Sequence, residues 1–171
     1  MTTSNGEQEA ARLERAVDSY IDRVAQVPPD LLEIAPAEGE WTIKELSAHS
    51  AEIYAYWASQ LATLRQTPHQ PFGRTMADTS RIAYVDTHKH DQLRYLISGI
   101  ELGAAQAAAA LRSFSPQEWA SVTGIHSARG EMDMDAISNL FLAGHAEEHL
   151  EQLDTTLEQV RAKASGPQAP R

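Results

Sequence analysis

The sequence predicts an all-helical four-helix bundle, and three observations support this fold class. Apolar residues recur at helical spacing through most of the 171 residues. Segments with the alternating apolar and polar residues of a strand are nearly absent. Stretches with proline and glycine divide the chain into four long helical segments, with a short extra helix before the last one.

The first helix is expected over about residues 7–26, where apolar residues fall on one face. It stops at Pro28 and Pro29, because proline cannot donate the backbone hydrogen bond that continues a helix. Thr42 then has the character of an N-cap, and Glu45 three residues later completes a capping box. We therefore expect the second helix to begin directly after Thr42.

A polar loop is expected at residues 66–78, and it separates the second helix from the third. Thr79 or Ser80 can cap the third helix, whose apolar stripe continues to Leu111. The segment 104–110 of this helix is nearly all alanine, which favours helix and permits a close approach to a neighbouring helix.

Ser115 and Pro116 resemble the start of another helix, with a cap followed by proline at the first helical position. It is expected to be short and to be followed by a loop at residues 120–132. The last long helix is expected over about residues 133–163, and the polar tail 165–171 is expected to be disordered.

The composition suits one domain, which we expect to span residues 1–164, with 42% hydrophobic residues to build a core. The 24 Asp and Glu residues outnumber the 14 Lys and Arg residues, so the net charge is -10. Because such a surface repels phosphate backbones and anionic membranes, we expect neither nucleic acid nor a membrane as a partner. The lack of cysteine excludes disulfides and thiolate ligands. Without an apolar signal core or an apolar run of about 18 residues, the chain is expected to be cytoplasmic.

Three histidines carry most of the chemical information: His49, and the pair His145 and His149. The pair is spaced i,i+4, which on a helix places both imidazoles on one face with Cβ atoms about 5–6 Å apart. Both fall in the middle of the apolar stripe of the last helix, and His49 lies at the edge of the stripe of the second helix. One divalent metal ion bound by all three is the leading interpretation, with open positions for water or substrate.

A second interpretation needs no metal, because buried imidazoles can also be satisfied by side-chain hydrogen bonds. The pair does not form a zinc-protease motif, since Ala146 follows His145 where that motif has its general-base glutamate. Glu147, Glu148 and Glu151 lie off the apolar stripe and are expected to be solvated.

The remaining polar candidates carry less information about the function. His126, in a glycine-containing loop, is a weak candidate for a catalytic acid or base, and a surface position is the simpler expectation. Tyr56 and Glu52 are expected near His49. His88 and His90, spaced i,i+2, face different ways on a helix and are expected to be solvated.

Two segments resemble the DinB/YfiT-like superfamily of metal-binding four-helix bundles. Residues 39–49, Gly-Glu-Trp-Thr-Ile-Lys-Glu-Leu-Ser-Ala-His, are similar to the entry to that family's second helix. Residues 145–149, His-Ala-Glu-Glu-His, are similar to the His-x-x-x-His in its last helix. The order of these motifs and the helix pattern between them agree over about residues 8–163.

The resemblance implies an up-down-down-up bundle, often a homodimer, with His49, His145 and His149 as the metal ligands. It implies nickel, zinc or iron as the metal. Characterised relatives include S-transferases and an isomerase that use mycothiol or bacillithiol, so a small-molecule thiol and an electrophilic substrate are the expected partners. Some relatives are induced by DNA damage, which concerns regulation rather than DNA binding.

Two functions follow from an open three-histidine site. The first is an enzyme, a thiol-dependent S-transferase or a metal-dependent hydrolase, because a cation held by neutral imidazoles acidifies a bound thiol or water. The second is a non-catalytic stress-response bundle whose metal is structural, in which case a fourth ligand such as His88, His90 or a glutamate would close the site.

Overall fold

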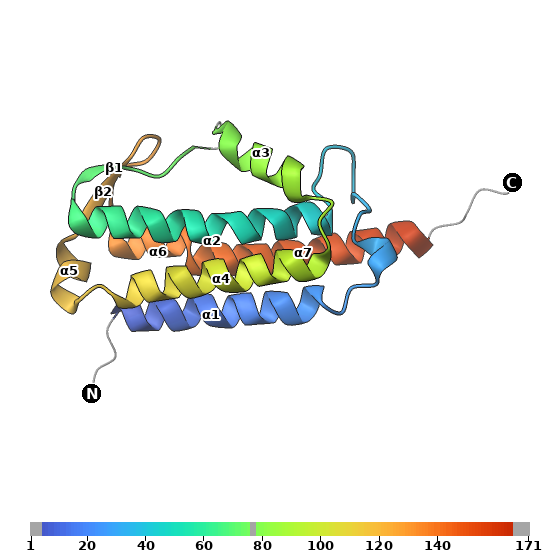
Figure 1. Ribbon diagram of the computed structural model, residues 1–171, viewed down its shortest axis with the longest axis horizontal. Coiled ribbons are helices and arrows are strands. Elements are labelled where there is room, and N and C mark those ends of the chain that lie inside the picture. Colours follow the sequence, from blue (N-terminus) through green and yellow to red (C-terminus); the bar gives the residue numbers. More distant parts are fainter. Residues whose placement is uncertain (1–4, 76–77, 166–171) are drawn as a thin grey trace, which may run out of the picture.

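Four long helices, α1, α2, α4 and α7, form an elongated bundle in the computed structural model, which describes residues 5–75 and 78–165 (Figure 1). The elements in chain order are α1 (Asn5–Val24), the 3-10 helix η1 (Pro29–Leu31), α2 (Ile43–Gln66), β1 (Gln70–Phe72), α3 (Thr79–His88), α4 (Leu93–Arg112), α5 (Pro116–Ser121), β2 (Thr123–His126), β3 (Gly130–Asp133), α6 (Met134–Phe141) and α7 (Ala143–Ser165). The prediction of an all-helical bundle with a short helix before the last long one is confirmed. Of the tail expected to be disordered, Ser165 ends α7, and residues 166–171 lie outside the described part of the chain.

Helices α2 and α4 run parallel and pack closely. A Cβ on Gly99 would meet the Ala51 Cβ at 3.0 Å, and a Cβ on Gly103 would meet the Ala55 backbone nitrogen at 3.2 Å. The contacts advance along both helices in the same direction, so the two are parallel. Because parallel neighbours need a long connection, the chain crosses back through β1 and through α3, which lies over α2 (Figure 1).

Helices α1 and α7 are also parallel to each other. Arg12 near the start of α1 binds Glu147, and Arg23 at its end binds Asp154, further along α7. Helix α1 is antiparallel to α4, since Gly6 packs against the backbone of Leu111. Together with the parallel α2 and α4, these contacts produce the up-down-down-up order.

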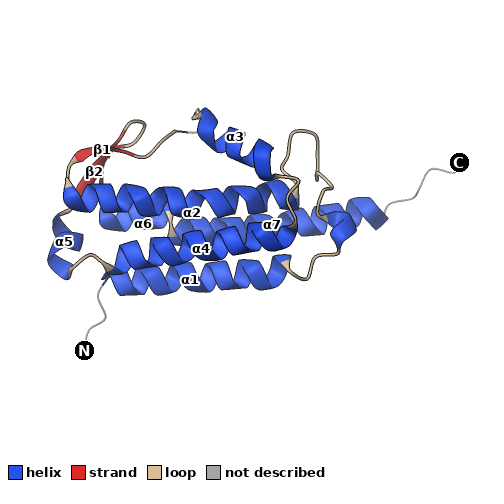
Figure 2. Ribbon diagram, in the orientation of Figure 1, coloured by secondary structure: helices blue, strands red, loops and turns tan. Residues whose placement is uncertain are grey.

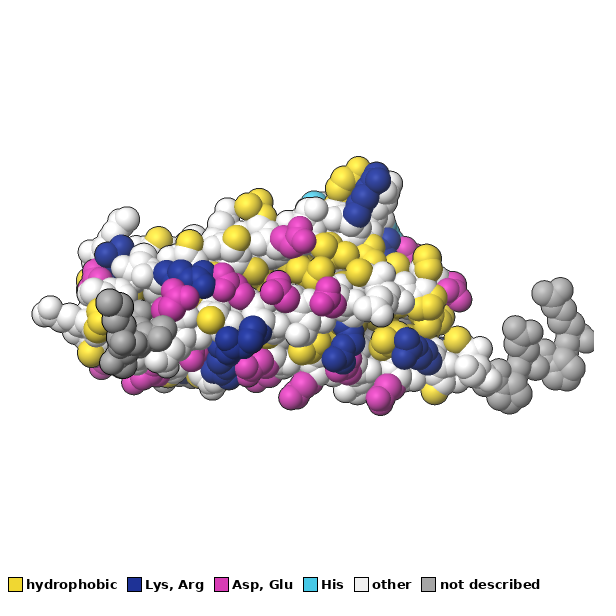
Figure 3. Space-filling model, turned by 90° about the horizontal axis from the view of Figure 1, so that it is seen from below, with side chains coloured by type: hydrophobic (Ala, Val, Ile, Leu, Met, Phe, Trp, Pro, Cys, Tyr) yellow, Lys and Arg dark blue, Asp and Glu magenta, His cyan; other side chains and the backbone are white. Residues whose placement is uncertain are grey.

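The face that carries α1 has acidic and basic side chains side by side (Figure 3). Arg112 of α4 reaches Glu14 at 2.6 Å and Glu7 at 2.8 Å on this helix. Solvent-exposed pairs of this kind contribute about 0–1 kcal/mol each, so the buried apolar side chains between the helices carry the stability. Among the described residues, every helix is too short or too polar to cross a membrane.

Two local capping predictions are confirmed. The Thr42 hydroxyl accepts from the Glu45 backbone N–H at 3.1 Å while the Glu45 carboxylate accepts from the Thr42 N–H at 2.9 Å. The same reciprocal box forms between Ser115 and Glu118 at the start of α5. Each box satisfies backbone donors that the first turn of a helix leaves unpaired.

The single helix expected from Thr79 to Leu111 is wrong, because the chain breaks between α3 and α4. Asp78, and neither Thr79 nor Ser80, is the residue that caps α3. The helix ends at His88, and a turn leads into α4. The segment between the two helices is polar and lacks an apolar stripe that would pack against the bundle. The chain turns there, and α4 then enters the bundle.

The last helix is likewise two helices. Leu142, with φ -129 and ψ -96, interrupts the backbone between α6 and α7. Directly after the break, Gly144 lies against Asn139, whose carbonyl oxygen would be 2.1 Å from an added Cβ. Glycine is therefore required for α7 to start so close to the end of α6.

The loops expected at residues 66–78 and 120–132 contribute instead to a small three-stranded sheet, ordered β1-β2-β3, at one end of the bundle (Figure 2). Strand β1 pairs parallel to β2, with Phe72 opposite His126, and β2 pairs antiparallel to β3. These strands have only three or four residues each, too few for a clear alternating pattern.

Candidate metal centre

The structure brings His49, His145 and His149 together at the interface of α2 and α7. One ring nitrogen from each lies within 4.8 Å of the others. The His49 ring centroid is 5.1 Å from that of His149 and 6.2 Å from that of His145, and the two α7 rings are 4.2 Å apart. Nitrogens this close can converge on one ion, because metal–nitrogen bonds of about 2 Å span such a cluster.

Hydrogen bonds orient the two histidines of α7. His145 Nδ1 is 3.1 Å from the Glu148 carboxylate, and His149 Nδ1 is 3.2 Å from the Gln152 side-chain oxygen. Both partners are acceptors, so each Nδ1 carries the proton and each Nε2 keeps its lone pair. Such partners on the far ring nitrogen are typical of metal-binding histidines.

Burial keeps two of the histidines neutral. Loss of hydration lowers the pKa of His49 to about 2, and the charges of His149, His145, Arg81 and Arg74 act in the same direction. Burial also lowers the pKa of His149 to about 3; His145 and Arg81 lower it further, and the bond to Gln152 opposes the shift. At neutral pH both imidazoles therefore present lone pairs, as metal binding requires.

Two buried nitrogens in the cluster have no hydrogen-bond partner among the described residues: His49 Nδ1 and His149 Nε2. Orphaned buried polar atoms cost about 1–3 kcal/mol each, so the alternative of histidines satisfied by side-chain hydrogen bonds fits poorly here. A divalent ion would use the His149 lone pair, and the donor set suits it.

A fourth protein ligand is absent from this cluster within the described residues. His88, one candidate for that position, has its Nδ1 2.7 Å from the Asp91 carboxylate instead. Glu148 binds the far nitrogen of His145 and so acts as an orienting partner. Three protein ligands with open positions are the pattern of catalytic rather than structural metal sites.

The three histidines line a cavity of about 820 Å³. Its apolar wall includes Trp57 and Phe141, whose rings stack at 4.2 Å, and Trp41, whose ring lies 5.1 Å from that of His49. His145 was expected at the centre of a core face, but its side chain is 26% exposed because it faces this cavity. A small organic molecule could thus reach the cluster.

His126 occupies a different place from the one expected. It lies buried on β2, not in a surface loop. The Ala128 N–H donates to its Nδ1 at 3.2 Å, so the proton is on Nε2, which donates to the Arg74 carbonyl at 3.1 Å. With both nitrogens engaged, the ring fixes the segment that carries Arg74.

Tyr56 and Glu52, expected near His49, contact Arg74 instead. The Glu52 carboxylate is 2.5 Å from the Arg74 guanidinium, and both side chains are largely buried. The same guanidinium lies 4.0 Å from the centroid of the Tyr56 ring. This buried ion pair joins the crossover segment to α2 beside the cavity.

Sequence reasoning missed Gln152 and the arginines of the cavity wall. The His-x-x-Gln spacing of His149 and Gln152 was a usable signal, since residues three apart on a helix are neighbours. The arginines approach from other elements, so no local spacing could have indicated them.

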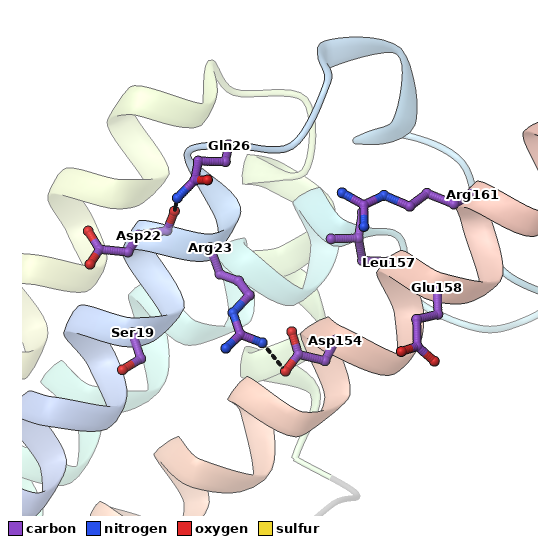
Figure 4. Close-up of a pocket in the computed structure, with 8 residues that line it drawn as sticks. All are labelled: Ser19, Asp22, Arg23, Gln26, Asp154, Leu157, Glu158 and Arg161. Carbon is purple, nitrogen blue, oxygen red and sulfur yellow. Dashed lines mark hydrogen bonds and ion pairs between the residues drawn. The ribbon is translucent and has the colours of Figure 1, made fainter.

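A second hollow of about 550 Å³ lies between α1 and α7, away from the histidines. Figure 4 shows its charged side chains, with the Arg23 and Asp154 ion pair across it. These exposed groups satisfy one another or solvent, so the histidine-lined cavity is the stronger candidate for chemistry.

Comparison with known proteins places this geometry in context. A family model described as the DinB superfamily matches residues 12–153. No curated protein matches the sequence significantly.

Solved structures share the fold. YfiT from Bacillus subtilis, described as a probable metal-dependent hydrolase with an unusual four-helix bundle topology, has a TM-score of 0.77 at 13% identity over 96% of this chain and 92% of its own. The four-helix bundle protein TT2238 has a TM-score of 0.64 at 20% identity, covering 88% of this chain and 99% of its own. A mycothiol-dependent maleylpyruvate isomerase has a TM-score of 0.61 at 16% identity, with 96% of this chain spanning 62% of that protein. At such identities the likeness establishes the fold alone.

Proposed function

The chain belongs to the DinB superfamily, and from this premise we propose that it binds one divalent transition metal through His49, His145 and His149 and catalyses a reaction on a small electrophile. The observation that carries the proposal is the position of the cluster: three imidazoles, two of them kept neutral by burial, line a cavity of about 820 Å³. Cavities of about 300–1,000 Å³ are the usual size for small-molecule sites.

The bound metal would supply a Lewis acid that makes water or a thiol a nucleophile at neutral pH. The chain's own residues would orient the metal ligands and exclude water. Glu148 and Gln152 hold the proton on the far nitrogens of the α7 histidines and so fix their lone pairs. Trp41 and Trp57 present apolar surface that excludes water from part of the cavity.

Two reaction classes fit this site. Hydrolysis uses water and is supported by the fold shared with the probable metal-dependent hydrolase YfiT. Transfer to a low-molecular-weight thiol is supported by the fold shared with the mycothiol-dependent isomerase. Zinc, nickel and iron all accept three imidazoles, so each is a candidate for the resident metal.

A purely structural metal is the alternative function. It would require a closed site, and the described residues offer no fourth ligand in this cluster. The accessible cavity beside the histidines therefore favours the enzyme.

The test is activity of metal-loaded protein with two general probes. p-Nitrophenyl acetate reports hydrolysis, and chlorodinitrobenzene with N-acetylcysteine reports thiol transfer. We expect metal-dependent turnover of at least one probe, abolished by a chelator and by His149→Ala, and unchanged in the control His90→Ala, whose side chain is exposed. Equal rates for metal-loaded wild type and His149→Ala with both probes would contradict catalysis at this site.

A further inference from the structure

The wall of the histidine cavity carries three arginines and also two carboxylates, those of Glu40 and Glu148. Arg74, Arg81 and Arg129 all line it, and they approach from the crossover segment, from α3 and from the turn between β2 and β3. An arginine of this wall that has no carboxylate partner would attract an anion.

Arg74 does not provide a free charge, because Glu52 neutralises it. The two groups are 2.5 Å apart, with side chains 7% and 14% exposed. A buried and fully paired guanidinium of this kind serves the structure, so ligand recognition falls to the other arginines.

Arg81 is held differently. Among the described residues it has no carboxylate within ion-pair distance, and its buried Nε has no acceptor. Its guanidinium lies 5.3 Å from the centroid of the Trp41 ring, and that ring in turn lies 5.1 Å from that of His49. Burial lowers the pKa of Arg81, and repulsion by Arg74 adds to this, partly offset by the charges of Glu52 and Asp78. An anion beside Arg81 would supply the missing negative charge.

Arg129 supplies a second cation on the wall of the cavity. Its guanidinium lies 6.0 Å from the centroid of the Phe141 ring, and no carboxylate pairs with it in the part of the chain that is described. The backbone N–H of Arg129 donates to the His126 carbonyl at 3.1 Å, which fixes the turn that presents it. Arg129 thus lies beside Phe141, whereas Arg81 lies beside Trp41.

We propose that the cavity binds an organic carboxylate with an apolar body, held through its carboxylate by Arg81 and assisted by Arg129. A planar guanidinium donates two parallel hydrogen bonds to a carboxylate, and Arg81 lines the cavity without a carboxylate partner among the described residues. The apolar body packs on Trp57 and Phe141. The proposal rests on the proposed function in that it defines the substrate class of the same site.

The experiment titrates metal-free wild-type protein with benzoate and with benzamide, which has the same ring and no charge. Trp41 and Trp57 line the cavity, so their fluorescence reports occupancy, and calorimetry supplies an independent affinity. Arg81→Met should weaken benzoate binding about 10- to 100-fold, the loss expected for charge-assisted hydrogen bonds. Arg81→Lys keeps the positive charge but lacks the planar pair of guanidinium donors, so it should recover only part of the affinity.

Arg94→Met is the matched control, because Arg94 is exposed on α4 outside the cavity. It should bind benzoate as the wild type does, and Arg129→Met should weaken binding by a smaller factor than Arg81→Met. The proposal is overturned if benzamide binds as tightly as benzoate, if benzoate does not bind the wild type, or if Arg81→Met binds like Arg94→Met.

Repeating the titration with His149→Ala separates this proposal from the metal centre. The carboxylate site uses arginine donors, so benzoate binding should persist in that variant. Benzoate bound through Arg81 in a protein that takes up no metal would support the anion site and contradict the proposed function. Metal uptake without benzoate binding would support the metal site of the proposed function and contradict the anion site.

Discussion

The metal-free protein should lose stability on acidification through His49 and His149. Both are buried, with exposed fractions of 3% and 5%, and burial lowers their pKa values from 6.5 to about 2 and about 3. In the unfolded chain each histidine takes up a proton as the pH falls below 6.5, whereas the folded chain does not. Their contribution to stability is therefore complete above pH 6.5 and is lost as the pH falls toward the folded pKa values.

The magnitude follows from linkage, since each proton bound only by the unfolded state costs about 1.4 kcal/mol per pH unit. At about pH 5 the free energy of unfolding should have fallen by about 2 kcal/mol for each histidine, and by about 4 kcal/mol for both. Because both folded pKa values lie well below this pH, neither ring is protonated in the folded protein, and the two contributions add.

The assay is urea denaturation, followed by tryptophan fluorescence, of chelator-treated protein at about pH 7.5 and about pH 5. The double variant His49→Gln with His149→Gln removes both titrations, so its stability should depend less on pH than that of the wild type. His90→Gln, a change at an exposed position, should behave as the wild type. Equal pH dependence in the wild type and the double variant would refute the reasoning.

Three further substitutions test individual contacts. Gln152→Leu removes the acceptor for His149 Nδ1 and should weaken metal affinity about 10- to 100-fold in competition with a chromogenic chelator; unchanged affinity would contradict the orienting role. Gly144→Ala places a Cβ 2.1 Å from the Asn139 carbonyl oxygen. It should cost about 1–3 kcal/mol in urea denaturation, and wild-type stability would contradict the close packing. Trp57→Ala should cost about 3–5 kcal/mol by the same assay, and a loss under about 1 kcal/mol would contradict its role in the core.

Local signals in the sequence predicted the features that local chemistry determines. The capping box at Thr42 forms as expected, and Ser115 caps α5 as expected, with a reciprocal bond to Glu118 that was not predicted. The apolar periodicity likewise predicted the bundle, because each long helix must bury one face.

The breaks and strands depend on contacts that are remote in sequence. Leu142 interrupts the helix between α6 and α7. The apolar spacing of the sequence continues through this position and does not indicate the break. Strand β1 pairs with β2 more than fifty residues later, from Phe72 to His126, so neither strand has its partner nearby in the chain. Helical spacing could not predict either feature.

The candidate site also combines features that the sequence predicted with features that only the structure shows. The sequence predicted that His49 would join His145 and His149, and the structure brings the three side chains together from α2 and α7. The sequence could not indicate that Arg81 would lie beside His49 through Trp41, because α3 reaches the cavity only through the crossover.

The central claim is tested most directly by metal content per chain, measured by elemental mass spectrometry on tag-free protein incubated with zinc, nickel or iron. The account predicts about one divalent ion per wild-type chain, as expected for a single three-histidine site. It predicts loss of that ion in His149→Ala and retention in His90→Ala, whose side chain is exposed and outside the cluster. A wild-type protein that holds no metal, or a His149→Ala variant that holds as much as the wild type, would contradict it.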